Sequence, residues 1–221
     1  MLKSAVLFVA AALGACVFEG CSHSTSPNGS AIFFQSPGAG SHFVFLGWDI
    51  DSMGHATPND LSLSQTVVAS GIAFAGKSNC TKLVDDSDAT NDLYIVHEPN
   101  GDLSVFDQNY WQLIPTGSQL PVSQVHYDTS SPGEIRKREV KWSYVGTEDL
   151  SVAGHTFHTV KLSCELHSWT NGVDDGTYIP NLTYWFAEET GWYVQVDFLS
   201  YDHNNNLEPA GKIALESYTL K

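Results

Sequence analysis

The stretch from Val140 to Phe198 decides the fold, because apolar and polar residues alternate in three runs within it. The runs are EVKWSY at 139–144, TVKLSCEL at 159–166 and WYVQVDF at 192–198. A period of two places successive side chains on opposite faces of a pleated strand. We therefore expect antiparallel strands with one buried face and one face in water.

Shorter runs of the same kind extend the pattern in both directions. Strands are expected at 43–50, 66–74, 77–84, 122–127, 138–146, 147–152, 156–167, 181–187, 192–201 and 211–220, and a hairpin at 93–106. Polar loops are expected at 49–60 and 85–92. Since no stretch after residue 16 keeps a capped 3.6-residue period, we expect little helix, with a single one around 107–120. The predicted fold class is all-β, a single curved antiparallel sheet or partial barrel.

Two hairpin turns set expected registers. Pro99-Asn100-Gly101 fits a type I turn with glycine in the left-handed position, or a two-residue Asn-Gly turn. The first option pairs Ile95 with Val105, and we prefer it because apolar residues then face each other. The loop 187–191 is expected to pair Phe186 with Trp192.

The first 40 residues differ in composition from the rest. Met1-Leu2-Lys3 and the apolar run 4–13 have the form of a signal peptide, and the run is too short to span a bilayer. Residues 22–41 are rich in Ser, Gly and Pro, which is typical of a flexible tether. The predicted organisation is a signal peptide at 1–15, a tether at 16–39 and one β domain at 40–221.

Leu13-Gly14-Ala15-Cys16 resembles the lipobox of bacterial lipoproteins. The resemblance implies that Cys16 carries the lipid and that the protein is extracytoplasmic and held to a membrane. Val17 stands where inner-membrane lipoproteins have Asp, so the resemblance favours the outer membrane. Cys21 follows a poorer version of the motif, and ordinary secretion with cleavage near Ala15 is the alternative.

The second half resembles secreted bacterial β-domains of unassigned function. The residues that carry this resemblance are Tyr144–Glu148, Val152–Phe157, Thr183–Ala187 and Gly191. Such families are similar to curved, partly open barrels of the lipoprotein-carrier type. The resemblance implies a fold and gives turn roles to Gly154 and Gly191, but it supplies no catalytic residue.

The net charge limits the partners. The chain carries a formal charge of −15 with only ten Lys and Arg. Phosphate backbones would repel such a chain, so nucleic-acid binding is excluded as a function. Attachment to anionic headgroups through charge is excluded for the same reason, which leaves the lipid on Cys16 as the expected link to a membrane.

Four cysteines are present. With Cys16 assigned to the lipid, we predict a disulfide between Cys80 and Cys164 in an oxidising compartment. Two separate buried thiols are the alternative.

Aromatic residues on the strands suggest a ligand site. We predict that an inward-facing set binds an apolar ligand: Trp142, Tyr144, Tyr184, Phe186 and Trp192. The alternative is that these rings are core residues and cross-strand pairs.

No local signature of catalysis or of cofactor binding occurs. The sequence lacks Gly-x-Ser-x-Gly, a Gly-rich phosphate loop and His-Glu-x-x-His. Asp86, Asp88 and Asp92 faintly resemble a calcium loop but lack its glycine and final glutamate. We therefore predict no cofactor, no metal and no enzyme activity. The expected function is that of a non-enzymatic envelope lipoprotein that binds an apolar ligand or a protein partner. The alternatives are a structural or adhesive protein with a filled core and a hydrolase with a dispersed site.

Overall fold

The computed structural model describes residues 34–221 except 52, 54, 108–109, 130–132 and 202–206. Twelve strands form a single sheet in the order β6-β5-β4-β3-β2-β1-β12-β11-β10-β9-β8-β7, and every neighbouring pair is antiparallel. No helix occurs among these described residues, and none is therefore long and apolar enough to cross a membrane. The predicted all-β class with one curved antiparallel sheet is confirmed.

The strand bounds are β1 (His42–Ile50), β2 (Ala56–Phe74), β3 (Lys77–Asp85), β4 (Asp88–His97), β5 (Leu103–Asp107), β6 (Tyr110–Ile114), β7 (Val122–Asp128), β8 (Arg136–Val152), β9 (His155–Thr170), β10 (Val173–Ala187), β11 (Trp192–Tyr201) and β12 (Leu207–Thr219).

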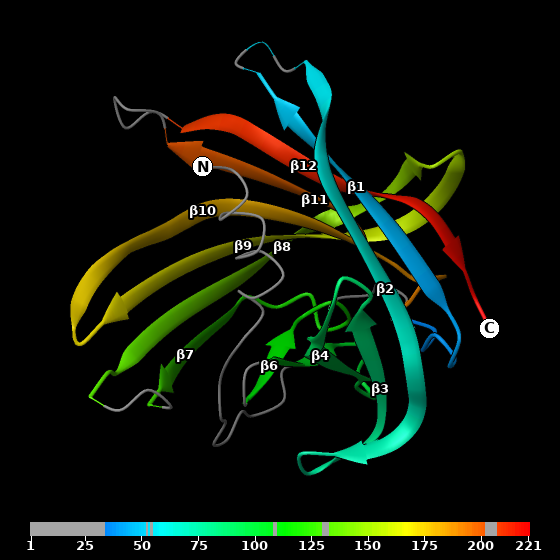
Figure 1. Ribbon diagram of the computed structural model, residues 1–221, viewed down its shortest axis with the longest axis horizontal. Helices are drawn as coiled ribbons and strands as arrows, with labels where there is room; N and C mark the ends of the chain where they lie inside the picture. The colour runs from blue at the N-terminus through cyan, green and yellow to red at the C-terminus, as the bar shows by residue number, and fades with distance from the viewer. Residues whose placement is uncertain (1–33, 52, 54, 108–109, 130–132, 202–206) are drawn as a thin grey trace.

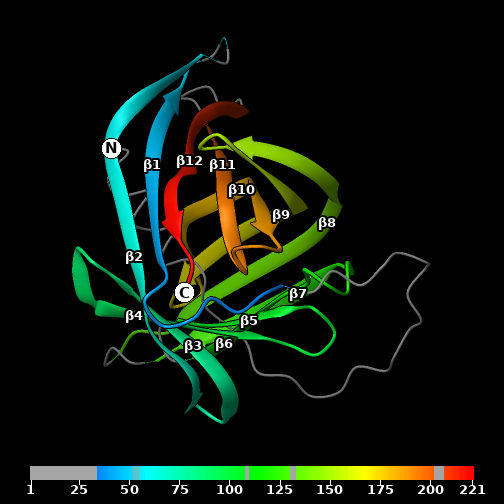
Figure 2. The same ribbon diagram turned by 90° about the vertical axis from the view of Figure 1, so that its right-hand side faces the viewer.

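The chain is an up-and-down meander whose two terminal strands meet in the middle of the sheet. β1 pairs with β12 from His42–Thr219 to Asp49–Gly211, and the two strands run side by side in Figure 1. The ends of the sheet are consequently β6 and β7, which are consecutive in the sequence. Figure 2 shows that the sheet curls so that both ends lie on the lower side of the molecule.

No backbone ladder joins β6 to β7, and one side chain takes its place. The Leu113 N–H donates to Gln124 Oε1 at 2.9 Å, and Gln124 Nε2 donates to the Leu113 carbonyl at 2.6 Å. The N–H and the carbonyl of Leu113 are thereby both hydrogen-bonded, as they would be in one residue pair of an antiparallel ladder. We call this junction the seam.

The loop 115–121 between these strands is fastened to the β4–β5 turn. Buried Asp102 accepts hydrogen bonds from the N–H groups of Gly117 (3.0 Å) and Ser118 (2.7 Å). The Thr116 hydroxyl donates to the Gly101 carbonyl at 2.8 Å. These contacts fix the position of the loop beside the β4–β5 turn.

Short hairpin turns keep the long strands in register. β8 and β9 are joined by Ala153 and Gly154, both with positive φ, and Val152 pairs with His155. Such φ values define a type I′ turn, which matches the twist of the strands. The turn roles expected for Gly154 and Gly191 are confirmed, since Gly191 also has a positive φ.

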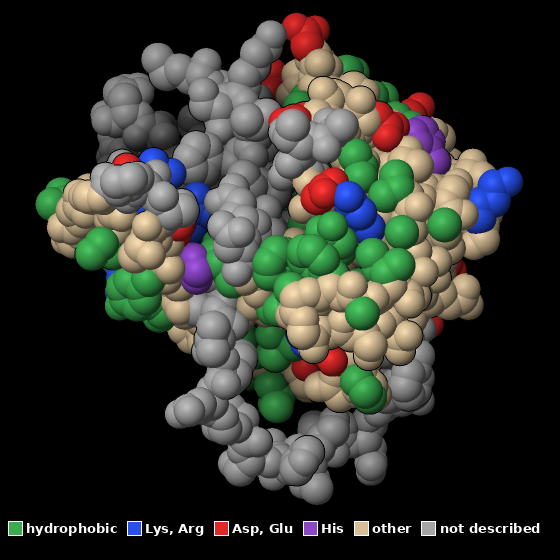
Figure 3. Space-filling view, turned by 60° about the horizontal axis from the view of Figure 1, so that its bottom comes forward, with side chains coloured by type: hydrophobic (Ala, Val, Ile, Leu, Met, Phe, Trp, Pro, Cys, Tyr) green, Lys and Arg blue, Asp and Glu red, His purple; other side chains and the backbone are tan. Residues whose placement is uncertain are grey.

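The alternating residues of the second half face the core as predicted. The inner face of β8–β11 contributes Val140, Trp142, Leu162, Cys164, Leu166, Leu182, Tyr184, Phe186, Val194 and Val196, all buried. They belong to one apolar cluster that includes Phe43, Phe45 and Ile95 from the first half. On the lower side of the molecule, hydrophobic side chains gather near the centre with acidic and basic ones scattered among them (Figure 3).

The chain packs on the sheet from Phe34 onward, within the segment predicted as tether. Phe34 is buried, and the Gln35 N–H donates to the Glu188 carbonyl at 3.1 Å. At Gly191 a Cβ atom would lie 1.8 Å from the Gln35 carbonyl oxygen. The half-buried His97 donates from Nε2 to the Gly191 carbonyl at 3.0 Å, and its Nδ1 lies 2.6 Å from the Ser36 hydroxyl.

Several local predictions are decided by the ladders. The preferred 93–106 register is confirmed, with Ile95 opposite Val105 and Tyr94 opposite Phe106. The pairing of Phe186 with Trp192 is wrong: Ala187 faces Trp192 and Phe186 faces Tyr193, because the loop between the strands has four residues, 188–191, rather than five.

Other predictions fail where a strand replaces the expected element. The helix around 107–120 is wrong, since 110–114 is a strand paired with β5. β2 begins inside the expected loop 49–60, and β4 begins inside the expected loop 85–92. The separate strands at 138–146 and 147–152 form one strand with a bulge after Tyr144.

We predict that Gln124→Met lowers the free energy of unfolding by about 2–3 kcal/mol, because it leaves both backbone groups of Leu113 without partners. Methionine keeps the length of the side chain, so packing changes little. Urea unfolding followed by tryptophan fluorescence measures the effect. A loss below about 0.5 kcal/mol would contradict the assigned role of the side-chain amide.

Candidate functional site

The predicted aromatic set lies in the interior. Trp142, Tyr184, Phe186 and Trp192 are each at most 2% exposed, and Tyr144 is half-buried against the core. The rings of Trp142 and Tyr184 lie 5.2 Å apart, and those of Tyr184 and Phe186 lie 5.8 Å apart. The structure therefore brings these residues together on the inner face, where they contact one another.

Three buried polar atoms on the inner face have no hydrogen-bond partner among the residues that the structure describes. They are Trp142 Nε1 and both side-chain amide atoms of Gln112, on residues that are 1% and 0% exposed. Protein interiors pair almost all such atoms, so each exception indicates an absent water, an absent ligand or stored strain. Gln112 on β6 precedes the Leu113 of the seam, and Trp142 on β8 pairs with Val122 on β7. Both lie on strands at or next to the ends of the sheet.

His126 adds a titratable group to the same region. It lies two residues from Gln124 on β7 and is paired in register with Arg138. Its ring centroid is 3.3 Å from that of Tyr110. Burial, which is the largest effect, and the Arg138 charge lower the pKa of His126 to about 4 against the opposing charge of Asp128. The imidazole is therefore neutral at physiological pH.

Sequence reasoning missed Gln112, Gln124 and His126. The signal for the last two is the parity of β7, where Gln124 and His126 face inward while Val125 and Tyr127 face outward. Hydrophobicity alone assigns the opposite face to each of these residues. Only the register with β8, which places Gln124 opposite buried Val140, shows which face of β7 points inward.

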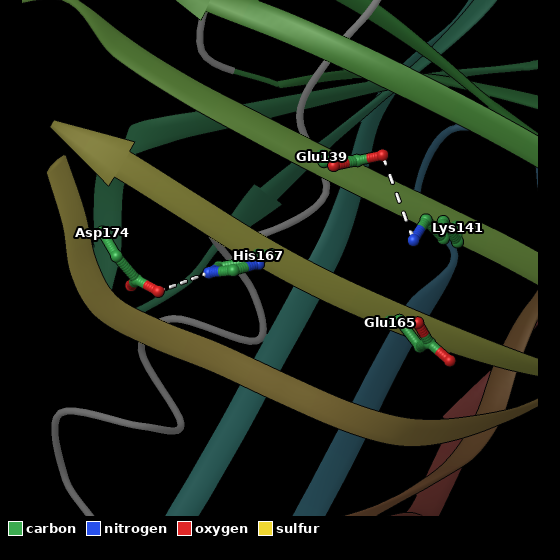
Figure 4. A pocket seen from close by; sticks show the side chains of 5 residues that line it. All are labelled: Glu139, Lys141, Glu165, His167 and Asp174. Atoms are coloured by element: carbon green, nitrogen blue, oxygen red, sulfur yellow. Dashed lines mark hydrogen bonds and ion pairs between the residues drawn. The ribbon is translucent and has the colours of Figure 1, made fainter. Parts of the chain in front are cut away.

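A second site is a pocket on the outer face of β8–β10. It has a volume of about 330 Å³ and is lined by Glu139, Lys141, Glu165, His167 and Asp174. As Figure 4 shows, His167 on β9 contacts Asp174 on β10 and Glu139 contacts Lys141 on β8. The N–O distances are 2.9 Å and 4.0 Å.

The predicted disulfide is absent from the structure, where Cys80 and Cys164 are free buried thiols. The Cys80 Sγ lies 3.5 Å from the Lys77 carbonyl oxygen, at the β2–β3 hairpin. Cys164 lies on β9 between Trp142 and Leu182. The pairing fails because the two residues occupy β3 and β9, six places apart in the sheet order. Burial raises the pKa of both thiols. Cys16 and Cys21 lie outside the described residues.

A serine, a histidine and an aspartate meet on the surface without forming a catalytic triad. His42 Nε2 lies 2.8 Å from Ser64 Oγ and 3.1 Å from Asp86 Oδ2. Ser64 Oγ also donates to Asp86 Oδ2 at 2.6 Å. In a triad the serine and the carboxylate bond opposite ring nitrogens, whereas here both approach Nε2. Hydrogen bonds from the Ser64 hydroxyl, then from the Thr66 hydroxyl and the His42 imidazole, lower the pKa of Asp86 against the opposing effect of burial.

Asp86 was also the first residue of the calcium-like stretch. Its carboxylate oxygens already accept hydrogen bonds from Ser64 and Thr66. Within the part of the chain that the structure describes, no three histidine, cysteine or acidic side chains are grouped so as to hold a metal ion.

Comparison with known proteins gives neighbours in fold. No protein-family model and no curated protein match the sequence. A candidate lipoprotein from Parabacteroides distasonis ATCC 8503 is 14% identical with a TM-score of 0.47, over 87% of this chain and 100% of that one. A candidate exported protein with a YmcC-like fold from Bacteroides fragilis NCTC 9343 is 14% identical with a TM-score of 0.41, over 86% and 99%. Neither likeness identifies a ligand or an activity, so the function is argued from the residues of this chain.

We predict that Gln112→Met raises the free energy of unfolding by about 1–2 kcal/mol, because it removes two buried polar atoms that have no partner. Gln124→Met is the matched control, because it is expected to lower the free energy of unfolding. Both variants are compared with the wild type by urea unfolding in ligand-free protein. Destabilisation by Gln112→Met would mean that its amide has a partner.

We also predict a stability loss at acid pH that depends on His126. The ordinary pKa of 6.5 applies to the unfolded chain and the value of about 4 to the folded one. Between these values only the unfolded chain binds the proton, so the free energy of unfolding falls as the pH falls from 6.5 towards 4. Between pH 7 and pH 4.5 the wild type should lose about 1–2 kcal/mol more than His126→Gln does. Equal losses in the two proteins would show that His126 is not buried in this way.

Proposed function

We propose that this chain is a non-enzymatic lipoprotein of the bacterial envelope, anchored to the outer membrane by a lipid on Cys16, that holds an apolar ligand against the inner face of its sheet. The ligand carries one uncharged polar group. The observation that supports the proposal is the set of unpartnered polar atoms of Trp142 and Gln112.

The free-energy cost of burying these polar atoms without a hydrogen bond argues that a ligand group pairs with them. A buried donor or acceptor left unpaired costs about 1–3 kcal/mol. Trp142 is also one of the five residues that the sequence pattern selects for ligand binding. A ligand group that accepts a hydrogen bond from the Trp142 N–H would explain why an indole stands at this position. Phenylalanine would fill much of the same space but has no N–H to donate.

The chemistry of the atoms limits the ligand. Trp142 Nε1 needs an acceptor, whereas the Gln112 amide offers a donor and an acceptor. A hydroxyl, an amide or a protonated carboxyl group satisfies these needs. The surrounding residues of the core are apolar, so the remainder of the ligand is apolar and a charge is disfavoured.

The seam supplies a route to the inner face. Elsewhere the sheet is joined by continuous backbone ladders, but β6 and β7 are joined by the Gln124 amide. Separating them breaks two hydrogen bonds, far fewer than separating any other neighbouring pair. An opening of this kind belongs to the low-energy local motions of a folded protein.

The experiment uses the uncharged methyl ester of a fluorescent fatty acid, 11-(dansylamino)undecanoic acid, and full-length mature protein. We predict micromolar binding, competition by 1-dodecanol and much weaker competition by dodecane, which lacks the polar group. Trp142→Phe should weaken binding about fivefold, as expected for one lost hydrogen bond.

Trp48→Phe is the matched control, because Trp48 lies outside the inner aromatic set, beside Lys212. It should leave the affinity unchanged. No binding by the folded wild type, or equal affinity in Trp142→Phe, would overturn the proposal in favour of a structural protein with a filled core.

A further inference from the structure

Ten side chains from four strands share one outward face at the β7 end of the sheet. The ladders place Ser123, Lys141 and Glu165 in one row, Val125, Glu139 and His167 in the next, and Tyr127, Lys137, Trp169 and Asp174 in the third. Residues directly opposite in antiparallel strands lie on the same face. We call this area the outer β7–β10 surface; it includes the 330 Å³ pocket.

One side of this surface is apolar and exposed. Tyr127 is 60% exposed and Val125 is 40% exposed, both on the edge strand β7. Ile135, at the start of the next strand, is also exposed and is tied by its backbone to Asn171. Exposed apolar side chains grouped beside polar ones mark interaction sites, and tyrosine is frequent among residues that dominate binding energy.

The other side, the pocket, carries more carboxylates than cations. Glu139, Glu165 and Asp174 face the single ammonium group of Lys141. Glu139 lies 4.0 Å from both Lys137 and Lys141. The Glu165 carboxylate makes no ion pair with any residue that the structure describes. A cation that enters the pocket would therefore be attracted by the Glu165 carboxylate, whereas an anion would be repelled.

Trp169 lies beside the pocket and packs on His167, which lines it. Lys137 Nζ lies 4.1 Å from the Trp169 ring centroid, and the His167 ring lies 3.9 Å from it. His167 is in turn held by Asp174 at 2.9 Å. Because both partners pack on the indole, the lining side chains are preorganised, which reduces the ordering cost of binding.

We propose that the outer β7–β10 surface docks an extended segment of a partner protein that carries an arginine or lysine beside apolar side chains. The cation enters the pocket against Glu165 and Glu139, and the apolar side chains cover Val125 and Tyr127. Val125 and Tyr127 are two residues apart on one face, a spacing that matches alternate side chains of an extended peptide. A second copy of this chain is a poor occupant, because each copy carries a formal charge of −15.

The test compares two synthetic peptides by calorimetry and by NMR titration of full-length mature protein. One is acetyl-Gly-Arg-Gly-Val-Gly-Val-Gly-amide, in which the arginine and both valines share one face of an extended chain, and the other has citrulline, a neutral isostere, in place of arginine. We predict that the arginine peptide binds about five- to tenfold more tightly at low salt, and that 0.5 M NaCl removes most of the difference. The shifted amide signals should map to β7–β10.

Two variants locate the contacts. Glu165→Gln should reduce the preference for arginine about threefold or more, whereas Glu216→Gln, an exposed acid on β12, should leave it unchanged. Tyr127→Ser should weaken both peptides equally. Urea unfolding confirms that each variant is folded.

Equal binding of the two peptides, shifts that map away from β7–β10, or equal effects of Glu165→Gln and Glu216→Gln would each overturn the proposal. Sedimentation of the wild type as a dimer that Tyr127→Ser dissociates would assign the surface to self-association and would also overturn it. Fatty-ester binding at the inner face is measured separately, so either proposal can fail alone.

Discussion

The amide of Gln124 holds the two ends of the sheet together. Because β1 and β12 pair in the middle of the sheet, its ends fall at β6 and β7, and no ladder joins them. Gln124 satisfies the N–H and the carbonyl of Leu113, and the Asp102 contacts fasten the intervening loop. An unpaired strand edge invites association with other chains; here the edge is partly protected by a side chain of the neighbouring strand.

Both proposed sites depend on this junction. The inner polar atoms belong to Gln112, which precedes Leu113, and to Trp142, which lies opposite the first residue of β7. The outer β7–β10 surface begins on the other face of β7, at Val125 and Tyr127. Strand β7 thus presents polar side chains to the interior and apolar ones to solvent, the reverse of an ordinary half-buried strand. Such a local contradiction of the pattern is expected at functional sites.

The sequence predicts the fold well where local patterning decides it. Alternation identifies the inner faces of β8, β9 and β11, and the Pro99-Asn100-Gly101 turn fixes the β4–β5 register. It fails where long-range pairing decides. The separation of Cys80 from Cys164 follows from the β1–β12 pairing, which no local feature of either strand encodes. Gln124 and His126 were missed because the parity of β7 is inverted, and Gln112 was missed because it is a polar residue on the inner face of β6.

Native-state hydrogen exchange at Leu113 tests most directly whether one side-chain amide closes the sheet. If it does, the Leu113 amide should exchange as slowly as amides within the ladders of β4 and β5, although β6 is an end strand with no ladder on that side. An exchange rate close to that of an unstructured peptide would show that the hydrogen bond to Gln124 does not persist, and that the two ends of the sheet are free of each other in solution.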